Sequence, residues 1–389
     1  MKKLKKLSLL PRVIIAIALG IACSFFFPGW AVRIFLTINS IFGNFLGFFI
    51  PLLIVGLIAP GIADLGRGAG RLLLITAGLA YLSTVLAGLF SYFTCRYVSP
   101  SLLGNSVDAL AAVDMSGGLT PYFTIEMPAF ISVTSALVLA FILGLGTSII
   151  GGTIFKGFLS DFREIVTVVI TNVIIPILPL YIFGIFLNMG SEGHVGTVLG
   201  MFIKIILVIF GMHVAVLLLQ FCIAGLVARR NPFRALLTML PAYATALGTS
   251  SSAATIPVTL AQTKKNGVTP EVADFTVPLC ATIHMPCSIL KIVACCYVVS
   301  LSMGQPIDFA TYAGFILMCG ITMVAAPGVP GGAIMAALGL IASMLGLDAN
   351  MQGIIIALYI AMDSFGTAGN VTGDGAIALI VDRIRTGRK

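Results

Sequence analysis

The sequence predicts an all-α protein that crosses a membrane many times. Of its 389 residues, 59% are hydrophobic and only 9% are charged, whereas a soluble domain carries about 25% charged residues. Apolar runs of about 20 residues, the length that spans the hydrocarbon core of a bilayer, recur from one end of the chain to the other. We therefore expect a polytopic membrane protein built from helices, since helices satisfy their own backbone hydrogen bonds in lipid.

Eight apolar stretches are long enough to be membrane-spanning helices. They lie at residues 10–27, 31–63, 72–98, 129–152, 165–189, 197–228, 274–302 and 351–381. The first follows a lysine-rich start that resembles a signal peptide, but no small-residue cleavage site follows it, so we expect it to remain as the first helix. We expect the polar segment 99–127 to lie outside the cell.

Two further apolar stretches, 236–262 and 310–344, are interrupted by proline and small residues. Basic residues concentrate in cytoplasmic loops of membrane proteins. In this chain the basic residues concentrate on the cytoplasmic side only if each of these stretches returns to the side from which it entered and both termini lie in the cytoplasm. We therefore expect two re-entrant helical hairpins that enter from opposite faces; two short tilted helices in either stretch are the alternative. The same topology accounts for the net charge of +8 without a nucleic-acid partner.

The two interrupted stretches also predict where a ligand binds. The inner one contains Thr249-Ser250-Ser251-Ser252, and the outer one has two prolines and three glycines within residues 327–332. Consecutive hydroxyls suit a tight tip that offers hydroxyls and backbone amides to a carboxylate, whereas the prolines and glycines suit a flexible gate. Non-helical backbone entering the membrane from both sides is typical of the midplane site of a secondary transporter with inverted repeats.

The last span carries four polar residues on one helical stripe. Asp363, Thr367, Asn370 and Asp374 lie at positions i, i+4, i+7 and i+11, so they share a face of a helix. Carboxylates deep in a membrane span are costly and usually functional. Their partners are a substrate ammonium, a metal cation or an internal basic residue.

The seventh span offers the basic candidates for that pairing. Its centre reads Thr282-Ile283-His284-Met285-Pro286-Cys287-Ser288, with Lys291 just beyond. Pro286 is expected to break the helix and free backbone carbonyls. The alternatives are a histidine that only packs and a lysine that extends toward the membrane surface. The eight cysteines have no metal-ligand spacing and are expected to be buried, reduced thiols.

Three other classes of protein are alternatives to a transporter. A membrane enzyme would need a dyad such as Ser252 with Lys291, but the sequence lacks the GxSxG turn of serine hydrolases. A simple channel is the second alternative, and substrate-saturable exchange would argue against it. A purely structural membrane protein would not need two interrupted hairpins and two buried carboxylates. We therefore expect no enzymatic activity and no cofactor.

Taken together, these segments resemble the dicarboxylate/amino-acid:cation symporter family, the group of glutamate transporters and serine/threonine symporters. The features that carry the resemblance are the serine-rich tip, the broken seventh span, the Gly328-Val329-Pro330-Gly331 gate and the D-x3-T-x2-N-x3-D helix, in that order. It is best from Asn231 to Asp382.

The family implies a homotrimeric elevator transporter. By resemblance, residues 1–70 supply scaffold helices 1 and 2, residues 71–98 supply helix 3 of the transport domain, and residues 99–195 supply the external segment and scaffold helices 4 and 5. Residues 196–389 complete the transport domain with helix 6, the hairpin at 236–262, helix 7, the hairpin at 310–344 and helix 8. The expected location is the plasma (inner) membrane.

The resemblance also implies roles for individual residues. It assigns the substrate ammonium to Asp363 and the substrate carboxylate to Asn370. The other residues that it places at the substrate are Ser251, Ser252, Val329, Pro330, Gly331, Gly366 and Thr367. The residues that it relates to the coupling cation or to charge coupling are Ser83, Thr84, Thr282, His284, Met285, Lys291, Asn370 and Asp374.

The chain departs from the family at the substrate. Transporters of acidic amino acids hold the second carboxylate with an arginine, in the last span or at the inner tip. Here these positions are Gly366 and Ser250, so the strong bidentate pairing of arginine with a carboxylate is absent. We expect a small neutral amino acid such as serine, threonine or alanine, with open space beside Gly366.

A second departure concerns the coupling ion, which stays open between sodium, a proton and none. The asparagine and aspartate of the family's sodium motif are replaced by His284 and Pro286, and a hard cation needs several oxygen ligands. Our hypothesis is that the charge of His284 or Lys291 replaces sodium and balances Asp374, with proton coupling through His284 as one form. A residual sodium site at Asn370 and Asp374 is not excluded. The alternative function is a sodium-coupled symporter of amino acids or dicarboxylates.

Overall fold

All the regular elements in the described part of the chain are helices. The computed structural model describes residues 9–64, 71–111, 119–191, 195–302, 304, 308–324, 326 and 330–387. In chain order the helices are α1 (Leu9–Ser24), α2 (Gly29–Asp64), α3 (Arg71–Ala111), α4 (Val133–Ile150), α5 (Thr153–Val169), the π-helix η1 (Ile170–Ile174), α6 (Ile175–Ser191), α7 (Val195–Ala228), α8 (Pro232–Thr249), α9 (Ser252–Lys265), α10 (Pro270–Ile283), α11 (Pro286–Ser302), α12 (Phe309–Val324), α13 (Gly332–Leu345), α14 (Ala349–Ala361) and α15 (Asp363–Thr386).

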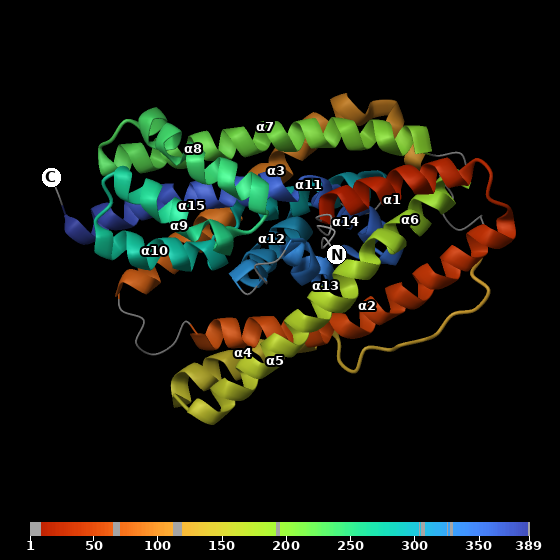
Figure 1. Cartoon of the computed structure of the whole chain (residues 1–389), viewed down its shortest axis with the longest axis horizontal. Coiled ribbons are helices and arrows are strands. Elements are labelled where there is room, and N and C mark those ends of the chain that lie inside the picture. Colours follow the sequence, from red (N-terminus) through yellow and green to blue (C-terminus); the bar gives the residue numbers. More distant parts are fainter. Residues whose placement is uncertain are drawn as a thin grey trace, which may run out of the picture.

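The helices form two packed groups. In the first, α2 packs against α4, α5 and α6, and α1 packs against α6. In the second, α15 is surrounded by α7, α8, α9, α10 and α11, while α3 lies against α7, α11 and α12 (Figure 1). The groups meet where α13 contacts α2 and α4, and where α14 contacts α1 and α6.

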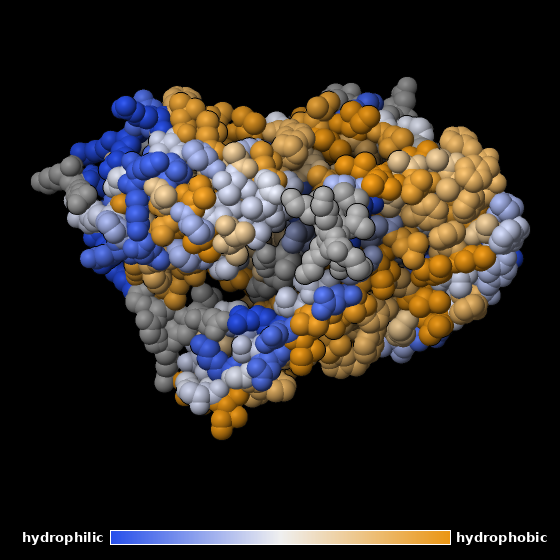
Figure 2. All heavy atoms as spheres, in the orientation of Figure 1, coloured by the Kyte–Doolittle hydropathy of each residue, from blue (hydrophilic) through white to orange (hydrophobic). Residues whose placement is uncertain are grey.

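Five helical stretches in the described ranges are long and apolar enough to cross a bilayer. They are Gly29–Ala63, Arg71–Val98, Thr153–Ser191, Phe202–Ala228 and Pro270–Ser302. Three of the predicted spans do not match a single helix of this length. In the first and in the span at 129–152, α1 and the apolar part of α4 are shorter. The eighth span consists of two helices with a bend between them. Figure 2 shows apolar residues over much of the visible face, with polar ones gathered at the end that holds α8–α10 and the carboxyl terminus.

The structure corrects two of the predicted boundaries. Residues 153–164, which lie between the predicted spans 129–152 and 165–189, form the first turns of α5. Their charged residues lie on one face of an amphipathic helix, a pattern that marks a surface helix as readily as a loop. Similarly, α3 continues through residues 99–111 of the predicted external segment, because a helix that has already formed extends at little cost.

Both interrupted stretches fold as helix–turn–helix units. In the first, α8 ends at Thr249, and Ser250 adopts the left-handed conformation with φ 50°. Ser251 then caps α9, because its side chain accepts the backbone N–H of Ala254. In the second unit, α12 and α13 flank a turn whose last residue, Gly331, is also left-handed with φ 76°. Each unit begins and ends within four residues of the predicted range.

Two other helices are broken, and the sequence predicted only one of the breaks. As expected from Pro286, α10 ends at Ile283 and α11 begins at the proline. The last span was predicted as one helix, but α14 and α15 meet at Met362 with a bend of 61°. No proline or glycine marks this bend; the only signal is Asp363-Ser364, residue types that favour the start of a helix.

Candidate functional site

The tips of both helical hairpins contact the start of α15. The Ser250 hydroxyl, at the α8–α9 tip, lies 2.7 Å from the Ser364 hydroxyl. The backbone N–H of Gly331, at the α12–α13 tip, donates to Asp363 Oδ2 over 2.8 Å. The α8–α9 tip, the α12–α13 tip and the bend between α14 and α15 therefore meet at the first two residues of α15. Backbone and side-chain polar groups gather there inside an otherwise apolar protein.

The predicted polar stripe of α15 packs along the break between α10 and α11. Asp363 lies beside Lys291, Asn370 contacts the first turn of α11, and Asp374 contacts His284 just before that turn. The two segments run in opposite directions, so Asp363, Asn370 and Asp374 each meet a different part of the seventh span. These contacts confirm the shared face for these three residues, whereas the Thr367 hydroxyl bonds to a carbonyl of its own helix.

Three glycines of α15 let the seventh span approach closely. A Cβ added at Gly366 would lie 2.5 Å from Lys291 Nζ, and one added at Gly369 would lie 2.4 Å from Cys287 Sγ. At Gly373 the added Cβ would lie 2.6 Å from Gln220 Oε1 of α7 and 3.1 Å from His284 Cε1. Side chains of the seventh span and of α7 thus fill the space that larger residues on α15 would need.

Lys291 is fully buried and has three partners. Its Nζ lies 3.4 Å from Asp363 Oδ1, 3.4 Å from the carbonyl oxygen of Met362 and 3.7 Å from the centre of the Tyr359 ring. The Asp363 side chain is 12% exposed and that of Lys291 is 0% exposed. An ammonium has three N–H donors, so a carboxylate, a carbonyl and an aromatic face provide one partner for each.

This position of Lys291 narrows one expectation and corrects another. We expected either His284 or Lys291 to balance Asp374; the structure places His284 beside Asp374 and Lys291 beside Asp363. We also expected open space beside Gly366, but the end of the Lys291 side chain fills it. Position 366 itself carries no cationic side chain, but Lys291 of α11 places an ammonium beside it.

Asn370 ties α15 to the start of α11. Its Oδ1 accepts the backbone N–H of Cys287 over 2.8 Å, and its Nδ2 donates to the Ser288 hydroxyl over 2.9 Å. The proline at 286 leaves the N–H groups of this first turn without partners inside the helix, and the asparagine oxygen satisfies one of them. One N–H of the Asn370 amide is left for another acceptor.

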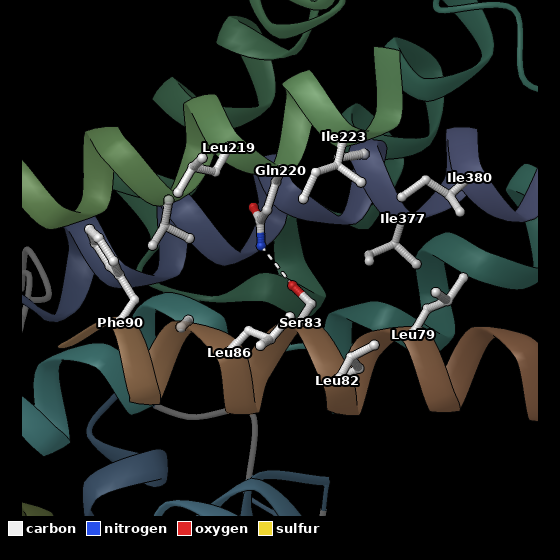
Figure 3. Close-up of a pocket in the computed structure, with 13 residues that line it drawn as sticks. Leu79, Leu82, Ser83, Leu86, Phe90, Leu219, Gln220, Ile223, Ile377 and Ile380 are labelled. Atoms are coloured by element: carbon white, nitrogen blue, oxygen red, sulfur yellow. Dashed lines mark hydrogen bonds between the residues drawn. The ribbon is translucent and has the colours of Figure 1, made fainter. Parts of the chain in front are cut away.

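His284 connects Asp374 to α3 and α7. Its Nδ1 lies 2.9 Å from Asp374 Oδ1, and its Nε2 lies 3.0 Å from the Ser83 hydroxyl. Ser83 in turn accepts a hydrogen bond of 2.9 Å from the Gln220 amide, which Figure 3 shows as the dashed line between α3 and α7. Four side chains, from α15, the break between α10 and α11, α3 and α7, therefore form a continuous polar chain.

An apolar cavity of about 290 Å³ flanks this chain between α3, α7 and α15. Its polar lining residues are Ser83 and Gln220; leucine, isoleucine and other apolar side chains make up the rest (Figure 3). Because the cavity is apolar apart from these two groups, it does not offer a second set of ligands for a polar substrate.

Asp374 and Asn370 do not offer a sodium ion a ready set of oxygens. Asp374 Oδ1 is held by the histidine nitrogen, and Asn370 Oδ1 is held by a backbone N–H. A hard cation binds several oxygens at short range, whereas here nitrogen donors already contact the carboxylate and amide oxygens. The residues present fit a site in which His284 occupies the position next to Asp374.

The remaining predicted residues have varied roles. Thr84 accepts the backbone N–H of Met285 over 3.3 Å, which fixes the break after His284. The hydroxyls of Thr282 and Thr367 bond to carbonyls of their own helices, at Leu279 and Asp363. Ser252 begins α9, and Pro330 lies in the turn before Gly331. Val329 lies outside the described residues.

Sequence reasoning missed four polar residues of this region. Tyr359 and Ser364 contact Lys291 and Ser250, and Gln220 contacts Ser83. His213 Nε2 lies 3.3 Å from the carbonyl oxygen of Cys287. Gln220 and His213 stand in a long apolar helix, and a polar residue in such a place is the signal that identifies them.

The sequence was compared with known proteins. The profile of the sodium:dicarboxylate symporter family matches residues 9–384. The serine/threonine transporter SstT of Acinetobacter baumannii (strain AYE) is 29% identical over 398 residues, which cover 97% of each chain. The neutral amino acid transporter B(0) of Rattus norvegicus is 27% identical over 316 residues, which cover 76% of this chain and 54% of the relative.

These matches confirm the resemblance that the hairpin tips and the α15 stripe predicted. The profile spans both helix groups and every residue of the site described above. The family and both relatives are named for transport and not for enzymatic activity. The chain is therefore a membrane transporter that belongs to the sodium:dicarboxylate symporter family.

Proposed function

We propose that the protein is a secondary transporter of small neutral amino acids, such as serine, threonine and alanine, and that it works without sodium. The observation that carries the proposal is the convergence of the two hairpin tips on Asp363 and Ser364, the first two residues of α15. The relatives named for serine, threonine and neutral amino acids support the substrate class.

In this proposal the amino acid lies between the hairpin tips. Its ammonium binds the Asp363 carboxylate, the acceptor for which a charged hydrogen bond is strongest. Its carboxylate lies at the first turn of α9, where Ser251 and Ser252 stand at a helix amino terminus, a natural site for an anion. The free N–H of the Asn370 amide supplies a further donor, and the Gly331 turn closes over the ligand.

The His284–Asp374 pair is proposed to take the place of a sodium ion. A protonated histidine 2.9 Å from Asp374 Oδ1 supplies the positive charge that a buried carboxylate requires. The site then works either as an uncoupled carrier or with a proton that His284 exchanges during the cycle. A residual sodium ion at Asn370 and Asp374 would have to displace two existing N–H donors.

The proposed architecture is an elevator with eight spans and two re-entrant hairpins. The scaffold consists of the helices in residues 1–70 and 99–195, and the transport domain consists of residues 71–98 and 196–389. The separate packing of α1, α2, α4, α5 and α6 supports this division. We further propose a homotrimer in the plasma membrane with both termini in the cytoplasm, where the basic tail after Asp382 suits the positive-inside rule.

Uptake into proteoliposomes tests this function. Labelled serine should accumulate or equilibrate at the same initial rate with an inward sodium gradient and with sodium replaced by choline. An imposed proton gradient then separates a proton-coupled carrier from an uncoupled one. Asp363→Asn should lower uptake at least about tenfold, because it removes the charge that binds the ammonium. Strict dependence on sodium would contradict the proposal.

One observation favours a second substrate class. Lys291 places an ammonium beside Gly366, near where relatives that carry acidic amino acids have an arginine, so an acidic amino acid or a dicarboxylate is the alternative cargo. However, Lys291 is already paired with Asp363. Competition decides between them: unlabelled alanine and threonine should block serine uptake, and aspartate and succinate should not.

A further inference from the structure

Lys291 occupies the place that the proposed function assigns to the substrate's ammonium. Its Nζ approaches Asp363 Oδ1, while Gly331 N–H holds Asp363 Oδ2. Both oxygens of the carboxylate are therefore engaged by groups of the protein itself, one of them by the backbone of Gly331. A substrate ammonium takes over the contact with Oδ1 only if Lys291 gives up its place.

The surroundings of Lys291 fit a charged ammonium that moves. Three partners from one short segment, residues 359–363, hold it: the Tyr359 ring, the Met362 carbonyl and Asp363. The contact with the carboxylate is 3.4 Å, longer than the 2.7–2.9 Å or so of a tight charged hydrogen bond. Such a pair neutralises Asp363 without binding it as firmly as a well-placed ligand does.

We propose that Lys291 is a built-in substitute for the substrate's ammonium, which lets the unloaded transport domain cross the membrane. The inference rests on the proposed function. An isolated carboxylate is costly at the centre of a bilayer. With Lys291 on one oxygen of Asp363, and the Gly331 N–H on the other, the empty site is neutral. The protein then carries out net transport and is not restricted to exchange of one amino acid for another.

The geometry also distinguishes Lys291 from a ligand of the substrate's carboxylate. The described contacts of Nζ are all with residues 359–363, on the ammonium side of the proposed site. The proposed carboxylate position is at the α9 tip, whose Ser250 contacts Ser364. Lys291 is thus a positioning residue that competes with the substrate for Asp363.

Lys291→Met tests the proposal, because it keeps the apolar stem and removes the charge. Two fluxes are measured in proteoliposomes: exchange, with serine on both sides, and net efflux into serine-free buffer. Exchange should be retained, whereas net efflux should fall about tenfold or more relative to exchange, since the empty site now carries a bare carboxylate. Serine affinity of the purified variant should stay the same or increase, because its competitor is gone.

A second variant acts on the same contact and leaves the lysine in place. In Gly366→Ala the new Cβ would lie 2.5 Å from Nζ and 2.6 Å from Cε, so the ammonium must move off Asp363. Gly366→Ala should therefore lower the ratio of net flux to exchange, as Lys291→Met does. Lys264→Met is the matched control, because it removes a lysine from the partly exposed pair with Asp274 and should leave the ratio unchanged.

The outcomes separate this inference from the proposed function. If the wild-type protein neither exchanges nor takes up neutral amino acids, the proposed function is wrong. If it does, and Lys291→Met keeps the wild-type ratio of net flux to exchange, the inference is overturned. Loss of serine binding in Lys291→Met also overturns it, since that result would make Lys291 a ligand of the substrate.

Discussion

Single glycines decide how closely the two polar segments of the site approach. Gly366, Gly369 and Gly373 stand opposite Lys291, Cys287 and His284, so each charged or polar partner reaches α15 through a gap left by a missing side chain. The three lie at i, i+3 and i+7 and line one face of the helix. These glycines serve packing against α11 and α10, and they do not leave space for the substrate.

Gly369→Ala tests this role at one position. Its Cβ would lie 2.4 Å from Cys287 Sγ, and overpacking of this kind costs about 1–3 kcal/mol. The melting temperature of the purified variant should therefore fall. Cys287→Ala in the same chain removes Sγ and should restore most of the loss. Equal destabilisation in the single and double variants would show that the contact is not responsible.

The sequence predicted which polar residues of α15 share a face but not which residue of the seventh span each one meets. The spacing of Asp363, Asn370 and Asp374 sets a helical face by geometry alone. The pairing of Lys291 with Asp363 depends on how α11 is placed along α15, and that placement follows from packing that no local pattern encodes. The same limit hid Tyr359, whose role depends on the bend at Met362.

At the scale of elements, composition predicted some breaks and missed another. Pro286 lacks an N–H and ends the preceding helix, so the break after Ile283 was predictable. The serines at 250–252 likewise marked the α8–α9 tip. The bend at Met362 has no residue that forbids a helix, and it arises where the Lys291 contacts and the hairpin tips meet.

Ser251→Ala tests the proposed tip of the first hairpin. Ser251 caps α9 by accepting the Ala254 N–H, and loss of such a cap costs about 1 kcal/mol. Amide hydrogen exchange at residues 252–255 should become about fivefold faster. Ser343→Ala, which removes a hydroxyl bonded to Gly339 within α13, is the control and should leave these amides unchanged. Unaltered exchange in Ser251→Ala would contradict the cap.

For the whole molecule, hydropathy and charge predicted an all-α membrane protein, and the helices confirm it. They could not supply the packing of two helix groups, because apolar faces in lipid carry little information about their partners. The eight-span topology, the elevator motion and the trimer remain proposals. What the structure adds at this scale is that each buried carboxylate of the site has a basic side chain beside it, and the proposed charge balance rests on these pairs.

That balance is the central claim, and thermodynamic linkage tests it most directly. If sodium and substrate were coupled, each would change the other's affinity by the same factor. We would therefore titrate the purified protein with serine, by calorimetry, in sodium buffer and in choline buffer. If His284 takes the place of sodium beside Asp374, as we propose, the Kd should differ by less than about twofold. A Kd more than about tenfold tighter in sodium would contradict the account.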